Sequence, residues 1–577
     1  MEAAPYMFPT SKKEVEALGW DYIDVIFFTG DAFVDHPSFG TAAISRWLQK
    51  FGYRVAIVPQ PGWKDDLRDF RKLGAPRLYF AVNAGAMDSM VNHYTAAKRL
   101  RSDDAYTPNG EAGKRPDYAV TVYTRILKKL YPDVPVIIGG VEASLRRLTH
   151  YDYWQDRLFP SILVDSGADY LSYGMGEKAM LELTRGIEAM RNPHEMRKIP
   201  QIAFYMKGKP HVKDALVLHS YEECLAEKRN LAENFHQIET HANMMHPSTI
   251  IEGAGDGYVQ VNPPFPPATT EEMDSYWDLP YTKLPHPRYR GKRIPAYDMI
   301  KFSINTHRGC FGGCNFCTIA AHQGKFIQSR SEKSILKEVE GLNRLPDFAG
   351  NISDLGAPTA NMYGMHGKNL NACDVCRRKS CLFPAPCPNL DRDHSRLIHL
   401  YAEVAKVRGI RHAYIGSGIR YDLFLSEKGY VDESSRPYLK ELILNHTSGR
   451  LKVAPEHTED KVLHYMGKPS FRLFERLRRE FDKITYDAGR RTELVPYFIS
   501  SHPGCTMHDM DCLAHNPALK GLYMDQVQDF TPTPMTTSSV MYYTGLNPHD
   551  MTPVFVERDP QKKKMQKSFF FKVKTKK

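Results

Sequence analysis

The stretch YIDVIFFTG (residues 22–30), followed by SFGTAAISRWLQKFG (38–52), sets the pattern that decides the fold class. The first run is mostly apolar, with VIFF at its centre, as in a strand buried on both faces. The second places apolar residues at helical spacing, with Ser38 as its predicted N-cap. The alternation repeats through YRVAIVPQP, DDLRDFRKLG, PRLYFAVNAG and VPVIIGG. Strands that alternate with helices predict a parallel sheet, and therefore an α/β, Rossmann-like doubly wound N-terminal domain. No G-x-G-x-x-G follows the first strand, so a dinucleotide site is not predicted.

A second series of strands begins after residue 300. Its six members are KFSINTH, NISDLG, HAYIGSGIR, LKVAPEH, ELVPYFISSHPG and QVQDFTPTP, and helical segments separate them. Within these segments, Ile335, Val339 and Leu342 are predicted to share one buried helix face. Six strands alternating with helices predict a partial (βα)6 barrel of the TIM type. Barrels of this type place their chemistry at the carboxyl ends of the strands.

The predicted domains are 1–255 (Rossmann-like), 256–297 (an extended Pro-rich connector), 298–535 (the barrel, with an inserted cysteine-rich loop at 366–394) and 536–577 (a C-terminal extension with a basic disordered tail). The net charge is +10, but the tail after residue 560 carries eight lysines and no acid, which leaves about +2 elsewhere. A nucleic-acid-binding surface over the whole protein is therefore not supported.

Neither a signal peptide nor a run of about eighteen apolar residues is present, so we expect a soluble cytoplasmic protein without a membrane partner. In that reducing compartment the ten cysteines are expected to be metal ligands or free thiols, because disulfides are rare there.

The stretch HRGCFGGCNFCTIAAHQGKF (307–326) has the spacing C-x₃-C-x₂-C, from Cys310, Cys314 and Cys317. A structural zinc site needs four ligands. Three thiolates on one short loop suit three corners of a cubane iron–sulfur cluster and leave the fourth iron open. The alternatives are a structural zinc site and an incidental cluster of cysteines.

This spacing after a strand resembles the signature of radical S-adenosylmethionine (SAM) enzymes, in which SAM chelates the open iron. Together with GGVEASLRRLTHYDYW, DLGAPTANMYG and SSHPGCT, it makes the chain similar to the YgiQ-type radical SAM proteins of bacteria from about residue 20 to 550. The resemblance implies an enzyme with a [4Fe-4S] cluster on the three cysteines. It also implies reductive cleavage of SAM, hydrogen abstraction from a substrate that it does not name, and an electron donor such as flavodoxin or ferredoxin.

The resemblance also suggests residues that contact SAM. Gly356 lies where the superfamily has a glycine-rich motif, although Leu355-Gly356-Ala357 replaces the usual Gly-Gly-Glu. Ser417 and Arg420 follow the next strand, and Glu456 ends the one after it. Each has a purely structural alternative, since a strand-end arginine often pairs with a local carboxylate. No catalytic residue is assigned. The candidates for facing the substrate are His307, Arg308, His322, Asp354 and His502.

A second group of thiols follows the second barrel strand, at Cys373, Cys376, Cys381 and Cys387. Four thiols in a Pro-containing loop predict a metal that staples the loop, either zinc or an auxiliary iron–sulfur cluster, and the spacing does not separate the two.

The N-terminal domain resembles a cobalamin-binding architecture, but the motif D-x-H-x-x-G is not matched, because Asp35 and His36 are adjacent and Gly40 follows four positions later. Cobalamin is therefore not expected, and His36 is expected to cap or pack.

Two other functions are compatible with the sequence. An RNA-modifying radical SAM enzyme related to methylthiotransferases would use the same cysteines and would bind RNA in a salt-sensitive way. A zinc-stapled, non-enzymatic nucleic-acid-binding protein would account for the lysine-rich tail and the second cysteine group. It would leave the first three cysteines without a fourth ligand.

Overall fold

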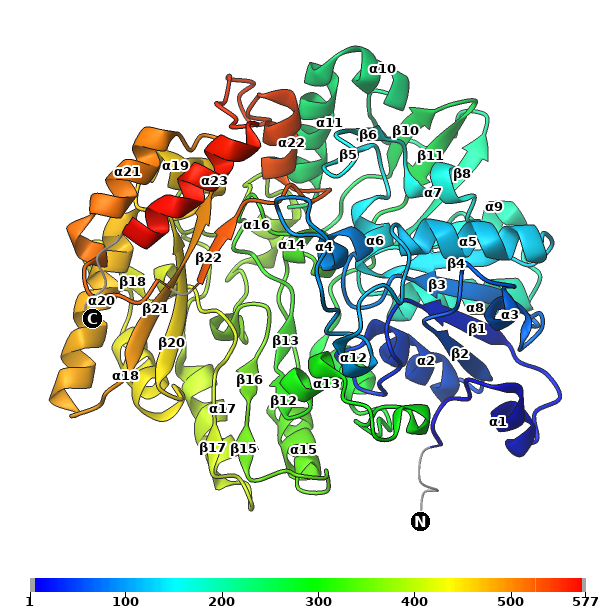
Figure 1. Cartoon of the computed structure of the whole chain (residues 1–577), viewed down its shortest axis with the longest axis horizontal. Helices are drawn as coiled ribbons and strands as arrows, with labels where there is room; N and C mark the ends of the chain where they lie inside the picture. Colours follow the sequence, from blue (N-terminus) through cyan, green and yellow to red (C-terminus); the bar gives the residue numbers. More distant parts are fainter. Residues whose placement is uncertain (1–5, 525, 573–577) are drawn as a thin grey trace. The chain divides into compact units, whose positions relative to one another are not determined.

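The computed structural model describes residues 6–524 and 526–572, and the chain forms two compact units (Figure 1). The first consists of Met1–Leu231, His246–Pro266 and Ser275–Lys301, and the second of Ala232–Met245, Pro267–Asp274 and Phe302–Lys577. The last boundary, at Lys301, lies close to the predicted start of the barrel at residue 298. Two short segments predicted to precede the barrel belong to the second unit. Within the described residues, every helix is too short or too polar to cross a bilayer.

The first unit is built on a nine-stranded sheet in the order β2-β1-β3-β4-β7-β8-β11-β10-β9. Its parallel part comprises β2 (Val55–Pro59), β1 (Val25–Thr29), β3 (Tyr79–Asn83), β4 (Val136–Gly139) and β7 (Tyr170–Ser172). β8 (Ile202–Lys207), β11 (Gly257–Val261) and β10 (Ile250–Ala254) continue it antiparallel, and β9 (Leu216–Val217) pairs parallel with β10. The predicted α/β class and its large parallel sheet are confirmed. The apolar run of β1 is buried at every position, because the sheet is covered on both faces.

The turn after β1 differs from the prediction that Ser38 caps the following helix. Helix α2 (Gly40–Lys50) begins two residues later, and its N-cap is Phe39, which has no side-chain cap. The backbone N–H of Ser38 instead donates to Nδ1 of His36 at 3.1 Å. The imidazole therefore accepts a backbone hydrogen bond in this turn, in keeping with the expectation that His36 caps or packs. The neighbouring Asp35 forms a buried ion pair with Arg46 at 2.5 Å.

The second unit contains all six predicted strand segments. They are β12 (Ser303–Asn305), β15 and β16 (Asn351–Ile352 and Asp354–Gly356), β17 (His412–Ala413), β20 (Arg450–Glu456), β21 (Glu493–Ser500) and β22 (Gln526–Asp529). β12 pairs with β16, β15 with β17, and β20 with β21 and then β22, all in parallel. A parallel bridge from Ile419 to Val453 joins the segment after β17 to β20. Segments that follow one another in the chain are thus neighbours in space.

Amphipathic helices bury their apolar faces in the core of this unit. Helix α15 (Glu332–Leu342) is capped by Ser331, whose side chain accepts from the N–H of Ser334. Its residues Ile335, Val339 and Leu342 are buried, as predicted. Helix α17 (Ser395–Lys406) likewise buries its apolar face, and both helices contribute to one hydrophobic cluster. These faces supply the burial that stabilises the parallel strands.

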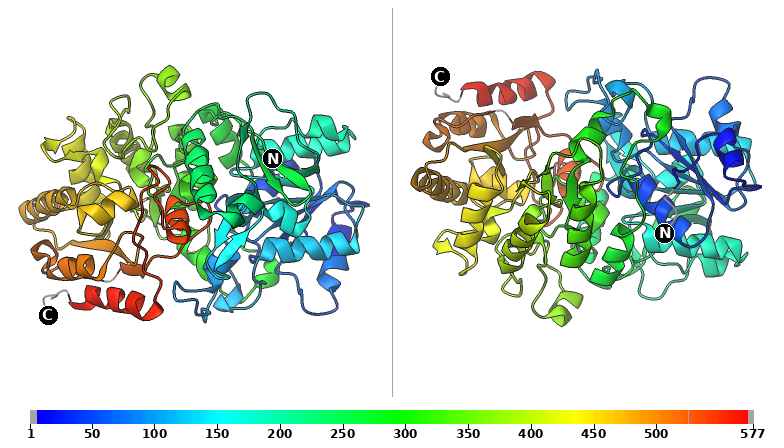
Figure 2. Two further views of the ribbon diagram at one scale, coloured as in Figure 1. Left: turned by 90° about the horizontal axis from the view of Figure 1, so that it is seen from above. Right: turned by 90° about the horizontal axis from the view of Figure 1, so that it is seen from below.

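The end of the chain is ordered where disorder was predicted. Helix α23 (Pro560–Ser568) and the 3₁₀ turn η6 (Phe569–Lys572) occupy most of the basic tail and lie on the outer surface of the second unit in both views of Figure 2. The prediction fails because Phe570 is completely buried, and Gln566 accepts from the N–H of Ser501 at 2.9 Å. These residues anchor a helix that carries its lysines outward. Residues 573–577, the rest of the predicted tail, lie outside the described residues.

The anchoring role of Phe570 can be tested against its neighbour. Phe570→Ala should lower the free energy of unfolding by about 3 kcal/mol, because it leaves a cavity in the core. Phe571 is 69% exposed, so Phe571→Ala should change the free energy by less than about 0.5 kcal/mol. Urea unfolding of the full chain, followed by far-UV circular dichroism, measures both. Equal effects of the two substitutions would show that the tail does not dock as described.

Candidate metal and cofactor site

The first cysteine group lies on a loop between β13 (His307–Arg308) and α14 (Ile319–Gln323). The backbone N–H of Cys310 donates to the carbonyl of Gly324 at 3.1 Å, and that of Cys317 donates to the carbonyl of Cys314 at 3.2 Å. These bonds fold the loop back on itself. Three thiols are thereby presented from one loop that follows β12, the first strand of this unit.

Two glycines make this path possible. Gly309 has φ of +89°, and a Cβ atom there would lie 2.1 Å from the carbonyl oxygen of Phe326. Gly313 has φ of +65°, and its Cβ would lie 2.3 Å from the Cβ of Ser380. Left-handed backbone without space for a side chain requires glycine at both positions.

All three sulfurs receive polar contacts from the protein, that of Cys317 from the backbone of Ile319. Arg420 Nη1 donates to Sγ of Cys314 at 3.1 Å. The backbone N–H of Gly312 donates to Sγ of Cys310 at 3.4 Å, and the hydroxyl of Thr359 lies 3.4 Å from the same sulfur. Donors around sulfur stabilise thiolates and tune a metal bound to them. The loop therefore has the thiol donors, and the second shell of N–H and O–H groups, that an iron–sulfur cluster uses.

Burial opposes ionisation of these thiols when no positive charge is near. It raises the pKa of Cys317 to about 12, with smaller contributions from Cys314 and Cys310, and it also raises the pKa of Cys310. A bound metal supplies the charge that deprotonates coordinating thiols. The chemistry of the donor set thus fits a metal cluster better than three free thiols.

Two of the residues predicted near SAM, Gly356 and Ser417, meet around Asp354. One oxygen of this carboxylate accepts from the N–H groups of Gly416 and Ser417 at 2.9 and 3.0 Å, and the other accepts from the hydroxyl of Ser417. A Cβ at Gly356 would lie 2.6 Å from that hydroxyl. The structure therefore brings Gly356 and Ser417 together, with the Ser417 hydroxyl directed to Asp354. Burial raises the pKa of Asp354.

Arg420 and Glu456 approach the cysteine loop from the following strand ends. Arg420 binds Asp422 through two nitrogens, with an ion pair of 2.5 Å. It therefore also has the local carboxylate partner that a purely structural role would require. Glu456 is buried, has φ of +70° and lies 3.8 Å from Nζ of Lys468. Burial raises the pKa of Glu456, and its charge in turn acts on Cys317. Both residues are therefore close to the cysteine loop.

The candidates for facing the substrate are distributed around the same strand ends. His307 is buried, and burial lowers its pKa to about 3. Its Nδ1 lies 2.9 Å from the hydroxyl of Thr306, and the ring also forms a hydrogen bond with the backbone of Thr359. His502 is also buried, and its Nε2 lies 2.6 Å from the hydroxyl of Ser538. Arg308, in β13, and His322, in α14, flank the cysteine loop directly.

The second cysteine group lies on a loop that rests on the first. The hydroxyl of Ser380 donates to the carbonyls of Phe311 and Gly312 at 2.8 and 3.1 Å. Burial raises the pKa of Cys381 to about 12, and the charge of the nearby Cys387 is the next largest cause of this shift. The remaining two thiols, Cys376 and Cys373, also act on that pKa. Across residues 6–524 and 526–572, no three His, Cys, Asp or Glu side chains are grouped closely enough to hold a single metal ion.

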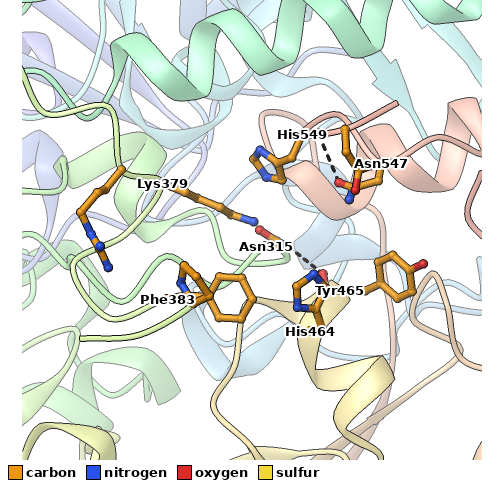
Figure 3. A pocket seen from close by; sticks show the side chains of 10 residues that line it. Asn315, Lys379, Phe383, His464, Tyr465, Asn547 and His549 are labelled. Atoms are coloured by element: carbon orange, nitrogen blue, oxygen red, sulfur yellow. Dashed lines mark hydrogen bonds between the residues drawn. The ribbon is translucent and has the colours of Figure 1, made fainter. Parts of the chain in front are cut away.

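A pocket that the sequence did not predict opens beside the first cysteine loop (Figure 3). It has a volume of about 280 Å³. It is lined by Asn315, Arg378, Lys379, Phe383, Pro384, His464, Tyr465, Asn547, His549 and Asp550. These residues come from four separate parts of the second unit. Only the basic run around Lys379, inside the cysteine-rich loop, was visible as a signal in the sequence.

Comparison with known proteins gives the family. A family model described as Radical SAM N-terminal matches residues 7–303, and one described as a domain of unknown function matches 525–574. A UPF0313 protein of Bacteroides thetaiotaomicron is 56% identical, covering 98% of this chain and 93% of that protein. The chain belongs to the UPF0313 family. Its relatives include the UPF0313 protein YgiQ of Escherichia coli, 42% identical over 98% of this chain and 83% of that protein. The predicted YgiQ-type family and the radical SAM superfamily are thereby confirmed.

Among solved structures, the radical SAM methyltransferase TsrM of Kitasatospora setae, with cobalamin and a [4Fe-4S] cluster bound, aligns with a TM-score of 0.46 and 14% identity. The alignment covers 89% of this chain and 74% of that one.

The strained path of the cysteine loop gives a test of the site. Gly309→Ala should lower the iron bound per chain after anaerobic reconstitution by more than about half. The substitution forces a left-handed residue, which costs about 1–2 kcal/mol, and also a clash with the backbone. Gly341→Ala, on α15, is the matched control and should bind iron normally, because a Cβ there would lie 3.6 Å from Nη2 of Arg344, an ordinary contact. Unchanged iron in the first variant would show that the loop does not need this path.

Proposed function

We propose that this chain is a radical SAM enzyme, with its second unit as the partial (βα)6 barrel. It would hold a [4Fe-4S] cluster on Cys310, Cys314 and Cys317, cleave SAM reductively and abstract hydrogen from a substrate. The observation that carries the proposal is the half-buried three-thiol loop after β12, with Arg420 donating to the sulfur of Cys314. Membership of the radical SAM superfamily supports it.

A [4Fe-4S] cluster held by Cys310, Cys314 and Cys317 would supply one-electron reduction of SAM, with the electron drawn from a flavodoxin- or ferredoxin-type donor and the products being methionine and a 5′-deoxyadenosyl radical. The residues of the chain bind and orient. Phe311 and Leu382 belong to an apolar cluster against which Cys310 packs, and this cluster keeps water from the sulfur. Arg420 fixes the position of the Cys314 sulfur.

The same strand ends are proposed to bind SAM. The backbone of Gly356 is proposed to receive the amino group of SAM, and glycine is required there because a Cβ would lie 2.6 Å from the hydroxyl of Ser417. Ser417 and Arg420 provide polar groups for its ribose and carboxylate. Glu456 has a buried carboxylate held in strained backbone, a feature typical of functional sites.

The second cysteine group is proposed to hold a metal as well, either zinc or an auxiliary iron–sulfur cluster. Because no three of these thiols lie close enough together among the described residues to hold one ion, binding would have to draw them in. Its four thiols act on one another electrostatically and lie on a loop that buries few apolar side chains. Such a loop gains stability from a metal staple.

Reductive SAM cleavage tests the main proposal. Anaerobically reconstituted protein, given SAM and dithionite, should yield 5′-deoxyadenosine. Cys314→Ala should yield none, because two thiolates do not hold the cluster with an open iron. Cys512→Ala, in α21 (Met507–His515), is the control and should match the parent. The proposal fails if the loaded parent neither forms 5′-deoxyadenosine nor changes its iron spectrum when SAM is added.

Metal analysis tests the second site. The reconstituted parent should contain metal beyond the roughly four irons of one cubane cluster, because four further thiols are available. Cys381→Ser should lose this excess and keep the first cluster, whereas Cys512→Ser should keep both. One zinc per chain would identify a staple, and additional iron with sulfide would identify a cluster. A parent with only four irons and no zinc would remove the second site.

A further inference from the structure

The pocket of Figure 3 lies next to the first cysteine loop, within the second unit. Asn315, in its wall, directly follows Cys314 in the chain. A molecule in the pocket would therefore lie close to the proposed reaction centre. None of the residues assigned to SAM lines this pocket.

Lys379 brings an unpaired positive charge to this space. Its side chain is partly buried, and among the described residues no hydrogen bond or ion pair reaches its Nζ. The carboxylate of Glu239, which acts on Lys379 electrostatically, is bound to Lys325 at 3.2 Å. Asp550 also lines the pocket, but among the described residues it forms no ion pair with Lys379. The ring of Phe383 lies 5.6 Å away. An ammonium withdrawn from water is costly without a counter-ion, so an anion in the pocket would be strongly favoured.

Two further polar atoms in the pocket lack partners. Asn315 is only 5% exposed, and its Nδ2 donates to the carbonyl of Tyr465 at 2.7 Å, which fixes the amide. Its Oδ1 is buried and, across the described residues, accepts no hydrogen bond. The same holds for Nε2 of His549. Because buried polar atoms are normally paired, both atoms point to a ligand with complementary groups.

The ligand must satisfy these atoms together. Asn315 Oδ1 can only accept, so the ligand must carry an N–H or O–H donor near its negative charge. Burial lowers the pKa of His549 to about 4, so its ring is neutral and offers one donor and one acceptor. Figure 3 shows Lys379 and Asn315 pointing toward the same space.

The size and wall of the pocket restrict the ligand further. A volume of about 280 Å³ lies at the lower end of ligand-binding pockets, which favours a small molecule over a segment of polymer. Phe383 and His464, with ring centroids 5.3 Å apart, form an aromatic wall. This wall suits the carbon skeleton of an organic anion better than a bare inorganic ion.

We infer that the pocket binds the substrate, and that the substrate is a small organic anion with an N–H or O–H group beside its carboxylate or phosphate. Lys379 pairs with the anionic group, and Asn315 accepts from the neighbouring donor. The inference rests on the proposed function in calling this molecule the substrate. The pocket itself is argued from its own residues.

Ligand-observed NMR with the reconstituted protein tests the inference. The probes are L-lactate, glycerol 3-phosphate and neutral ethylene glycol, without reductant. At least one anion should bind and ethylene glycol should not, and the two anions distinguish carboxylate from phosphate. Lys379→Met should weaken binding at least tenfold, because it removes the counter-charge. Lys440→Met, on the exposed face of α18 (Ser435–Asn445), should leave binding unchanged.

Two further measurements guard against a misfolded variant. His549→Phe keeps a ring in place and should weaken binding without shifting the melting temperature. In the unaltered chain, trinitrobenzenesulfonate labelling followed by peptide mapping should show that the bound probe protects Lys379 and leaves Lys440 reactive.

The inference is overturned if neither anion binds, if both bind equally well to Lys379→Met, or if SAM displaces the probe competitively. Binding is measured without SAM cleavage, so the two proposals fail separately. Lysine-dependent binding by a protein that cannot cleave SAM would remove the proposed reaction and keep the anion site. SAM cleavage by a protein that does not bind the anions would remove the anion site and keep the proposed reaction.

Discussion

The buried guanidinium of Arg420 holds the site together before any cofactor arrives. It binds Asp422 through two nitrogens and Cys314 through a third. The backbone of Arg420 is fixed in turn by Asn361, which accepts from its N–H at 2.8 Å and donates to its carbonyl at 2.9 Å. Three segments are thus connected through one side chain. A buried cation is tolerated here because its nitrogens are paired, and loss of any partner would leave a charge without compensation.

The parallel order of the strands explains why this connection is possible. Each strand end is brought beside the next, so residues that follow β12, β16, β17 and β20 meet although long helices separate them in the chain. At the last of these ends the register shifts between Val453 and Glu456, and Glu456 takes a left-handed conformation. A buried carboxylate in strained backbone costs stability. That cost is understandable at a functional site and has no evident purpose in a purely structural strand.

The sequence predicted what depends on local pattern. The strands of both units, the buried face of α15 and the cysteine triplet all follow from spacing within a few residues. The tail was misjudged because its lysines dominate the composition, whereas two phenylalanines and one glutamine decide its docking. The Ser38 cap was misjudged because His36, two residues earlier, accepts the N–H of Ser38, and the helix begins after Phe39. The pocket could not be predicted, since Asn315, Lys379 and His549 meet only through the tertiary fold.

The position of Lys379 bears on the role of the second cysteine group. Lys379 and Ser380 lie between Cys376 and Cys381, and they serve two purposes at once. Ser380 closes over the first cysteine loop, while Lys379 extends into the pocket. A loop that must hold both side chains needs rigidity, which its few apolar contacts do not provide. A metal on the four thiols would provide that rigidity without transferring an electron. Zinc would therefore serve the geometry as well as an auxiliary cluster would.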